Sequence, residues 1–356
     1  MNKILKIIIG VLITIIIILG VILTYYLVQL SPVSNDKEII NFEVPKGSSG
    51  SEIASLLAEK KLIRDENVFK LYLKLNNVDN ISYGTYKLNK NMGVKLIVEA
   101  LVSQRTVNKD IKLLFREGEN MRAYAKTIAK YTNNTEENVF ELLKDNIYLD
   151  SLITKYWFLT DEIKNTQLYY SLEGYLAPNT YNFKNKDVTI EEIFEKMLDQ
   201  TDKVLTPYKD KILNNDFTIH EFITFASVVE SEGINKNDRA LIASVFYNRL
   251  KINMAFQSCA TACYAKKFDG SCSPTNVDTK YKSPYNTYQI DMTGMPVGPI
   301  SNPGLISIEA SLNPSKTDYL YFLSDENKNT YFFKKYEDHI AKKNELIASG
   351  DKLYVR

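Results

Sequence analysis

The hydrophobic positions of the chain form one long uncharged run at the N-terminus, followed by short periodic segments. No charged residue occurs from Ile7 to Leu30, and at about 1.5 Å per residue a helix of this length spans the roughly 30 Å apolar core of a bilayer. Cleavable signal sequences have shorter apolar cores, and no Ala-x-Ala-like site follows this run. Lys3 and Lys6 precede it. The pattern therefore predicts one transmembrane helix, with a cytoplasmic N-terminus and an extracytoplasmic body.

A small unit is predicted in residues 31–105. After a polar spacer, the pattern gives strands at 41–44 and 83–88 and helices at 51–60, from Asp65 onward and at 92–102. Asp65 is the expected N-cap of the second helix. A strand–helix–helix–strand unit of this size is typical of small glycan-binding modules, and a plain spacer domain would show the same pattern.

A larger mixed unit is predicted in residues 106–356. The expected elements are a strand at 111–115, helices at 121–131, 136–146, 189–206, 218–232, 239–250 and 306–312, and a hairpin of 319–323 with 330–333. Residues 173–181 are expected to form a rigid loop, and residues 251–304 a long irregular one. Long structured loops are usually functional or disordered. The whole pattern predicts an α+β protein.

The helix predicted at 218–232 has the clearest signals. Thr218 and Glu221 have the spacing of a capping box. The apolar residues that recur at helical spacing are Ile219, Phe222, Phe225, Ala226 and Val229. This spacing places Glu230 at the margin of the apolar face and predicts that Glu232 points away from it.

Two interpretations of Glu230 follow from the pattern. A carboxyl group in apolar surroundings is more readily protonated, so Glu230 is a candidate proton donor. Alternatively, Glu230 is a structural residue at the end of the helix that forms a salt bridge with a partner such as Arg239. Spacing alone favours the structural interpretation.

The charge balance excludes some classes of function. Lys and Arg total 44 against 43 Asp and Glu, for a net charge of +1, so nothing indicates a nucleic-acid partner. The only histidines are His220 and His339, which excludes a multi-histidine metal site and offers no recognisable Ser-His-Asp motif. No metal and no cofactor are expected. The 24 tyrosines provide flat faces and hydroxyl groups that suit carbohydrate, although tyrosines also fill cores.

All three cysteines, Cys259, Cys263 and Cys272, fall within one segment. Outside the cytoplasm, two of them could form a disulfide, or all could remain free thiols. A zinc site would need a fourth ligand, and no histidine lies nearby in the sequence.

Seven short motifs occur in a fixed order along the chain. They are Glu173-Gly-Tyr-Leu-Ala-Pro-Asn-Thr-Tyr181, Ala226-Ser-Val-Val-Glu230, Ala243-Ser-Val-Phe-Tyr-Asn-Arg-Leu250, Tyr285-Asn-Thr-Tyr288, Gly294-Met-Pro-Val-Gly-Pro-Ile300, Asn302-Pro-Gly304 and Tyr319-Leu-Tyr-Phe322. In this order they resemble the membrane-anchored endolytic murein transglycosylases, of the peptidoglycan terminase type. The resemblance runs from the anchor to about residue 340.

The resemblance implies a three-part architecture and an activity. Residues 1–30 would hold a cytoplasmic stub and the transmembrane helix, 31–105 a spacer and a LysM-like βααβ module, and 106–356 a mixed α+β catalytic domain. The implied reaction cuts the MurNAc–GlcNAc β-1,4 bond of nascent peptidoglycan, forms 1,6-anhydroMurNAc and ends glycan elongation. The implied location is the bacterial cell membrane. Expected partners are peptidoglycan glycan strands, membrane lipid around residues 7–30, and peptidoglycan synthases with other elongation or division proteins.

The resemblance also implies roles for individual residues. Glu230 would protonate the glycosidic oxygen and, as a carboxylate, would then accept the proton of the muramic C6 hydroxyl. Substrate binding would involve Glu173, Tyr175, Asn248, Gln257, Ser258, Tyr285, Asn286 and Tyr288.

Two departures from the family pattern leave alternatives open. The family usually has Gln-Ser-Asp-Pro-Thr where this chain has Gln257-Ser-Cys-Ala-Thr261, and Tyr331 stands where the family has a histidine. One alternative is a catalytically silent glycan-binding scaffold of the cell-wall machinery. The other is a hydrolytic muramidase, which would need a second carboxylate, such as Glu173 or Asp291, to activate water.

Overall fold

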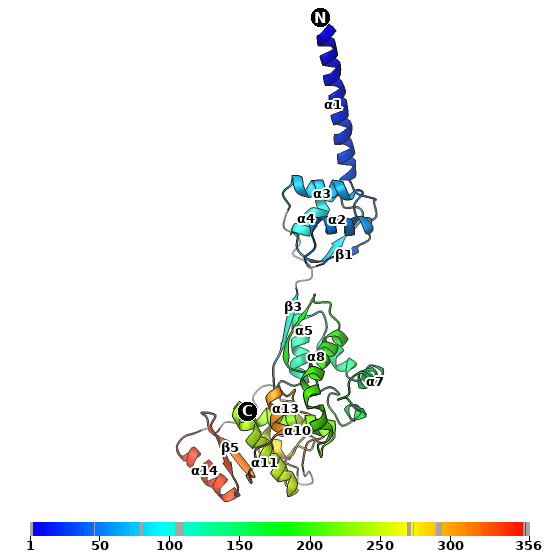
Figure 1. Cartoon of the computed structure of the whole chain (residues 1–356). Coiled ribbons are helices and arrows are strands. Elements are labelled where there is room, and N and C mark those ends of the chain that lie inside the picture. Colours follow the sequence, from blue (N-terminus) through cyan, green and yellow to red (C-terminus); the bar gives the residue numbers. More distant parts are fainter. Residues whose placement is uncertain are drawn as a thin grey trace. The chain divides into compact units, whose positions relative to one another are not determined.

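The computed structural model describes residues 3–45, 47–78, 81–103, 110–268, 272, 274–289, 294–351 and 353. The chain divides into two compact units, one of residues 1–111 with 183–186 and one of residues 112–182 with 187–356 (Figure 1). Helix α1 (Lys3–Gln29) begins the chain. Within the described residues, its segment Ile9–Gln29, with a mean hydropathy of 2.8, is the one helix long and apolar enough to cross a membrane. The predicted helix is confirmed, and its insertion into a membrane stays a prediction.

The first unit has the predicted order of strands and helices. Strand β1 (Ile40–Val44) pairs antiparallel with β2 (Gly84–Leu88), with Phe42 opposite Tyr86. The helices are α2 (Gly50–Glu59), α3 (Glu66–Leu75) and α4 (Val94–Ser103). The predicted cap is confirmed, since the Asp65 side chain accepts from the backbone N–H of Val68 at the start of α3. Both cross-strand partners, Phe42 and Tyr86, are buried in the core of this unit.

The second unit combines helices with two small sheets. Strand β3 (Ile111–Phe115) pairs with β4 (Asn179–Phe183), and β5 (Tyr321–Ser324) pairs antiparallel with β6 (Thr330–Phe333). Its helices are α5 (Met121–Tyr131), α6 (Glu136–Leu142), α7 (Asn146–Lys155), α8 (Ile190–Leu205), α9 (Lys209–Leu213), α10 (Ile219–Glu232), α11 (Arg239–Lys251), α12 (Cys259–Ala265), α13 (Leu305–Leu312) and α14 (Tyr336–Ala348). Short 3₁₀ turns lie at Asp161–Lys164, Thr206–Tyr208, Lys236–Asp238 and Asp278–Lys280.

Helix α10 is the central helix of this unit. It packs against α11, α12 and α13, and every residue from Phe222 to Glu230 is buried (Figure 1). The predicted capping box of Thr218 and Glu221 is present at its start. The expectation of a single buried face is wrong, because neighbours cover α10 on several sides, and exposure is left at Glu221 in its first turn and at Ser231 and Glu232 in its last.

Several elements differ from the sequence prediction. The helix expected at 136–146 ends at Leu142, and α7 follows it; β4 occupies part of the predicted loop 173–181; α12 lies inside the stretch expected to be irregular; and α9 and α14 were not predicted. Neither α12 nor α14 begins with a side-chain capping hydrogen bond, and the N-cap of α14 is Lys335, which is not a usual capping residue.

Candidate active site

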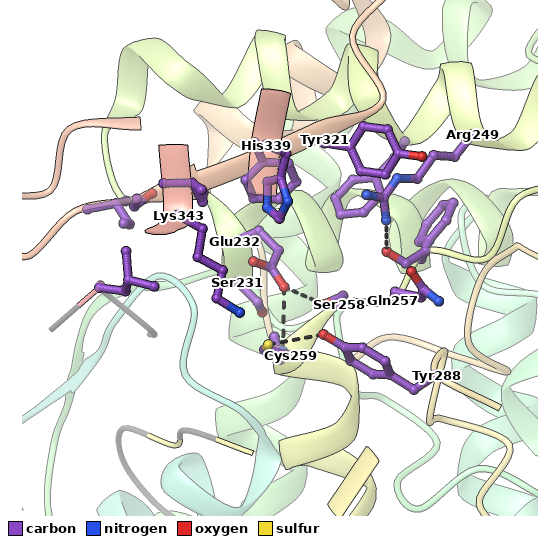
Figure 2. Close-up of a pocket in the computed structure, with 18 of the residues that line it drawn as sticks. Ser231, Glu232, Arg249, Gln257, Ser258, Cys259, Tyr288, Tyr321, His339 and Lys343 are labelled. Carbon is purple, nitrogen blue, oxygen red and sulfur yellow. Dashed lines mark hydrogen bonds between the residues drawn. The ribbon is translucent and has the colours of Figure 1, made fainter. Parts of the chain in front are cut away.

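The last turn of α10 borders a pocket of about 320 Å³ (Figure 2). Its walls come from the end of α10, from α11, from residues 256–260, from Tyr288, from β5 and from α14. Aromatic rings and hydroxyl groups are frequent among these lining residues, and Glu232 is their only acidic side chain. The pocket therefore combines a single carboxylate with surfaces suited to a polar ring such as a sugar.

Glu232 is partly exposed, and its carboxylate lies in the pocket. Its Oε1 accepts a hydrogen bond from the Ser258 hydroxyl and one from the backbone N–H of Ala260, at 3.4 Å (Figure 2). Ser258 is itself fixed, because its backbone N–H donates to Thr287 Oγ1 at 3.1 Å. Glu232 points away from the buried residues of α10, as predicted, and the sequence did not show that its carboxylate would lie in a pocket.

Glu230 occupies a different environment. Its side chain is fully buried, and Oε1 lies 2.6 Å from Nη2 of the buried Arg239. Oε2 accepts from the backbone N–H of Gly304 at 3.1 Å and from Ser307 Oγ at 2.9 Å. Glu230 is not among the residues that line the pocket. The geometry thus matches the structural interpretation and corrects the expectation that this side chain lies at the edge of a cleft.

Arg249 fixes one wall of the pocket. Its Nε donates to the carbonyl of Leu320 at 2.7 Å and its Nη1 to the carbonyl of Phe256, so it ties α11 to the start of β5. The guanidinium carbon lies 5.5 Å from the centre of the Tyr321 ring, within the range of a cation–π contact. Burial lowers the pKa of Arg249 from its usual range.

Helix α14 supplies pocket residues that the sequence did not single out for binding. His339 and Lys343 both line the pocket, and the His339 ring lies 5.9 Å from the Tyr321 ring, centre to centre. Burial, with the positive charges of Lys343 and Arg249, lowers the pKa of His339. A neutral imidazole and an exposed ammonium group therefore face the same pocket as Glu232 (Figure 2). The one available signal was that His339 is one of only two histidines.

Cys259 is the free cysteine, and it lies at the pocket wall. Its Sγ is 3.2 Å from the hydroxyl oxygen of Tyr288. Burial, together with the negative charge of Glu232, raises the pKa of the Cys259 thiol to about 11, so the thiol is protonated at neutral pH. Cys263 and Cys272 form a disulfide, which settles the alternatives left open by the sequence.

Three of the eight predicted substrate residues line the pocket, namely Gln257, Ser258 and Tyr288. The motif residues Gln257 and Ser258 are held by Thr287, which accepts the Ser258 N–H through its hydroxyl and the Gln257 N–H through its carbonyl. Their loop position, directly before α12, brings them to Glu232.

The other five lie elsewhere and hold the fold together. Glu173, Tyr175, Tyr285 and Asn286 are buried, and Asn248 donates to the carbonyls of Thr317 and Tyr319. Glu173 accepts from the backbone N–H of Met121, and Tyr175 bonds His220 Nδ1 at 2.9 Å. Tyr285 accepts from the N–H of Tyr169, and Asn286 donates to three backbone carbonyls. The expectation of direct substrate contact is corrected for these residues, because their polar groups bond other parts of the protein.

Three further residues were named in the alternatives drawn from the sequence, Asp291, Tyr331 and Glu173. Asp291 lies outside the described residues. Tyr331 is on β6 and donates to Asp325 Oδ2 at 3.0 Å, away from the pocket lining. Glu173 is 1% exposed, so it offers no carboxylate to a water molecule in the pocket.

A second pocket of about 410 Å³ meets the first. Ser231 and Ala260 line both pockets. Glu232 follows Ser231 in the chain and bonds the N–H of Ala260, so its carboxylate stands beside the junction. The lining of the second pocket also includes Glu119. A carboxylate beside the junction of two pockets, with aromatic and hydroxyl-bearing walls, is an arrangement expected of an enzyme that acts on a polysaccharide strand.

Comparisons with known proteins agree with this class. The model of the YceG-like family matches residues 42–345, and the chain belongs to that family. It is 37% identical to the endolytic murein transglycosylase of Bacillus subtilis strain 168, over 90% of this chain and 88% of that protein. It is 32% identical to the endolytic murein transglycosylase of Streptococcus pneumoniae serotype 2, over 88% of this chain and 60% of that protein. A crystal structure of a YceG-like protein from Listeria monocytogenes matches with a TM-score of 0.62 and 38% identity, over 86% of this chain and 99% of that one.

Proposed function

We propose that this protein is an endolytic murein transglycosylase whose catalytic acid is Glu232. The observation that carries the proposal is the position of this carboxylate, which is the only acidic side chain among the described residues that line its pocket and stands beside the junction with a second pocket. The curated relatives that bear this name support the reaction class. Glu230 is replaced in this role because its carboxylate bonds Arg239, Gly304 and Ser307 inside the protein.

One carboxylate can serve both halves of the reaction. The protonated Glu232 donates its proton to the glycosidic oxygen as the bond from that oxygen to C1 of N-acetylmuramic acid breaks. The carboxylate then accepts the proton of the C6 hydroxyl of the same sugar, whose oxygen forms a new bond to C1. The products are a 1,6-anhydro sugar and a free C4 hydroxyl on N-acetylglucosamine, and no water is consumed.

The surroundings of Glu232 support this alternation between acid and base. The Ser258 hydroxyl and the Ala260 N–H donate to Oε1 and hold the carboxyl group in one orientation. Both donors come from residues beside the pocket, so the carboxyl group is oriented where a substrate can reach it.

We also propose roles for the first unit and for helix α1. The first unit is proposed to be a LysM-like module that holds glycan, supported by a cavity of about 410 Å³ whose lining includes Ser48, Ser51, Lys70 and Lys74. Helix α1 is proposed to anchor the enzyme in the cell membrane with its N-terminus in the cytoplasm. There the enzyme would cut nascent strands close to the peptidoglycan synthases and so end their elongation.

Mass spectrometry of released fragments tests the reaction. The purified full-length chain in detergent is incubated with uncross-linked glycan strands, with the Glu232→Gln chain as the matched control. We expect fragments that end in 1,6-anhydroMurNAc from the wild type and none from the variant. Fragments heavier by one water, about 18 Da, would show a hydrolytic muramidase instead, because hydrolysis adds a base-activated water. Binding without fragments would show the glycan-binding scaffold.

A further inference from the structure

The second pocket has no role in the reaction described above, although it adjoins the acid. It is lined by the turn before α5, by α12 and by the segment after α12, and it includes Tyr264, Phe268 and the Cys263–Cys272 disulfide. An enzyme that cuts inside a strand must hold sugars on both sides of the bond it breaks. The pocket around Glu232 accounts for one side only.

Phe268 gives this pocket an exposed aromatic surface. The residue is 41% exposed, although it is a large apolar side chain that lies at a pocket wall. Its backbone is held at both ends: the Phe268 N–H donates to the carbonyl of Cys263 at 3.1 Å, and its carbonyl accepts from Arg122 Nη2 at 2.9 Å. The ring is thus presented to solvent from a fixed backbone, which lowers the entropy lost when a ligand stacks on it.

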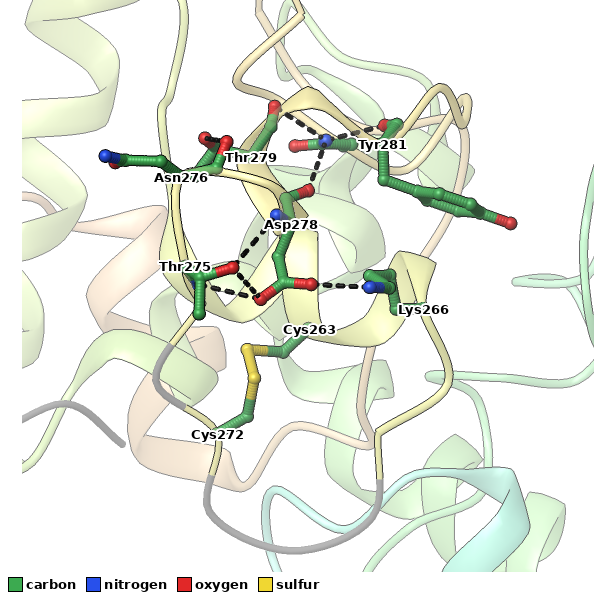
Figure 3. A network of polar contacts seen from close by, with 9 residues as sticks. Cys263, Lys266, Cys272, Thr275, Asn276, Asp278, Thr279 and Tyr281 are labelled. Atoms are coloured by element: carbon green, nitrogen blue, oxygen red, sulfur yellow. Dashed lines mark hydrogen bonds and ion pairs between the residues drawn. A yellow bond between two sulfur atoms is a disulfide. The ribbon is translucent and has the colours of Figure 1, made fainter.

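Residues near Phe268 in the chain are joined by covalent and ionic links (Figure 3). The disulfide joins Cys263 of α12 to Cys272. Lys266 Nζ lies 2.5 Å from Asp278 Oδ1, and Asp278 Oδ2 accepts from the backbone N–H and the hydroxyl of Thr275, each at 2.7 Å. The disulfide holds Cys272, which lines the second pocket, to α12, the helix whose first turn also bonds Glu232.

From this geometry we infer that the second pocket binds the sugars on the far side of the scissile bond, with the Phe268 ring as a stacking surface. The inference rests on the proposed function and names the residues that let the enzyme grip a continuous strand. The chemistry fits an amino sugar, because one face of the sugar ring is apolar and suits Phe268, while its hydroxyl and acetamido groups suit Glu119, Asn120 and Ser231.

Phe268→Ala is the variant that tests this subsite. It removes the exposed ring and leaves the two backbone bonds in place, so the fold is retained. Tyr281→Ala is the matched control, because Tyr281 is a 45% exposed aromatic residue of the same region that does not line the second pocket. We expect the KM for long glycan strands to rise about 3- to 10-fold in Phe268→Ala with little change in kcat, and no change in the control. Phe268→Trp, which keeps an aromatic face, should restore the wild-type KM.

A binding measurement separates this inference from the proposed reaction. Glycan oligomers of increasing length are titrated by calorimetry into the full-length Glu232→Gln chain, with and without Phe268→Ala. We expect the affinity to increase with oligomer length until both pockets are filled. For oligomers that fill both pockets, Phe268→Ala should weaken the affinity about 3- to 10-fold, as for the KM. Equal affinities for the two chains would overturn the inference. An absence of cutting by the wild type would overturn the proposed reaction while leaving this binding result to be judged separately.

Discussion

The two glutamates at the end of α10 are two residues apart and have opposite environments. Glu230 is fully buried and bonded to the buried Arg239, whereas Glu232 is partly exposed in a pocket and bonded to neutral donors. Glu230 links α10 to the start of α11 and of α13; Glu232 reaches the start of α12. The chemistry of a carboxylate is therefore set by where the helix ends and by which neighbours cover it.

The difference follows from access to the pocket. Glu230 is fully buried beside Arg239 at 2.6 Å, so a substrate does not reach its carboxylate. Glu232 is partly exposed and lines the pocket, so its carboxyl group can exchange a proton with a bound substrate. The same residue type thus serves structure at one position and, in the proposed reaction, catalysis at the other.

Replacing Glu232 by a residue that cannot donate a proton should have the largest effect on the rate of strand cutting. Glu232→Gln keeps the shape of the side chain, and we expect the rate of strand cutting to fall by about 10²- to 10⁴-fold, the usual contribution of a general acid. The free energy of unfolding should stay within about 0.5 kcal/mol of the wild type, as for other substitutions at exposed sites. Cutting rates and urea denaturation of the same preparations measure both quantities.

Glu137→Gln is the control for this experiment, because Glu137 is an exposed glutamate on α6, outside the pocket lining. It should change neither quantity. A Glu232→Gln chain that still cuts strands at the wild-type rate would show that another group is the acid.

Removing Glu230 should affect stability instead. Glu230→Ala leaves Arg239 buried without its carboxylate, and we expect the free energy of unfolding to fall by about 3–5 kcal/mol, as for other broken buried pairs. Urea denaturation and a lower Tm would measure the loss. The double variant Glu230→Met with Arg239→Leu should recover much of it, because no uncompensated charge remains. Full stability of Glu230→Ala would mean that the pair contributes little.

The sequence predicted most of the fold, whereas the resemblance gave the acid role to Glu230 and the proposal above gives it to Glu232. Elements with clear start signals were confirmed, such as α3 with the Asp65 cap and α10 with the Thr218–Glu221 box. The pattern also located five of the six described strands and missed β4, which overlaps a segment predicted to be a loop. The salt bridge of Glu230 with Arg239 was foreseen as the structural alternative.

The site itself depends on contacts that periodicity does not encode. A pattern of apolar residues reports one buried face, but α10 is covered on several sides by α11, α12 and α13, of which α12 was not predicted and α13 is distant in the sequence. Polar motif residues such as Tyr175 and Asn286 proved to bond the protein interior, because hydrogen-bonding residues satisfy buried groups as readily as they bind sugars. His339 and Lys343 reach the pocket only because α14 folds back onto β5 and β6.

Glu173 is a third carboxylate that can be compared with Glu230 and Glu232. It is buried like Glu230, but the groups that donate to it are mainly neutral. It accepts from the N–H of Met121 at 2.9 Å, from Tyr264 Oη at 2.9 Å and from Asn302 Nδ2 at 3.2 Å. Burial raises its pKa from 4.5 to about 7, and these hydrogen bonds, with the charge of Arg122, only partly oppose that rise. Without an arginine in direct contact, its charged form is disfavoured.

The raised pKa of Glu173 predicts a pH dependence of stability. Between pH 4.5 and about 7 the folded protein binds more protons at Glu173 than the unfolded chain, so the free energy of unfolding should fall as the pH rises through this window. The full change corresponds to about 3 kcal/mol and is complete above the folded pKa. Urea denaturation at several pH values would measure this change in the free energy of unfolding, with Glu173→Gln as the reference chain.

The Glu173→Gln chain loses this pH dependence even if it is less stable overall, because glutamine does not titrate. The lowered pKa values of His220 and His339 act in the opposite direction in both chains and cancel in the difference. Identical pH profiles for the two chains would show that the pKa of Glu173 is not raised in the folded protein.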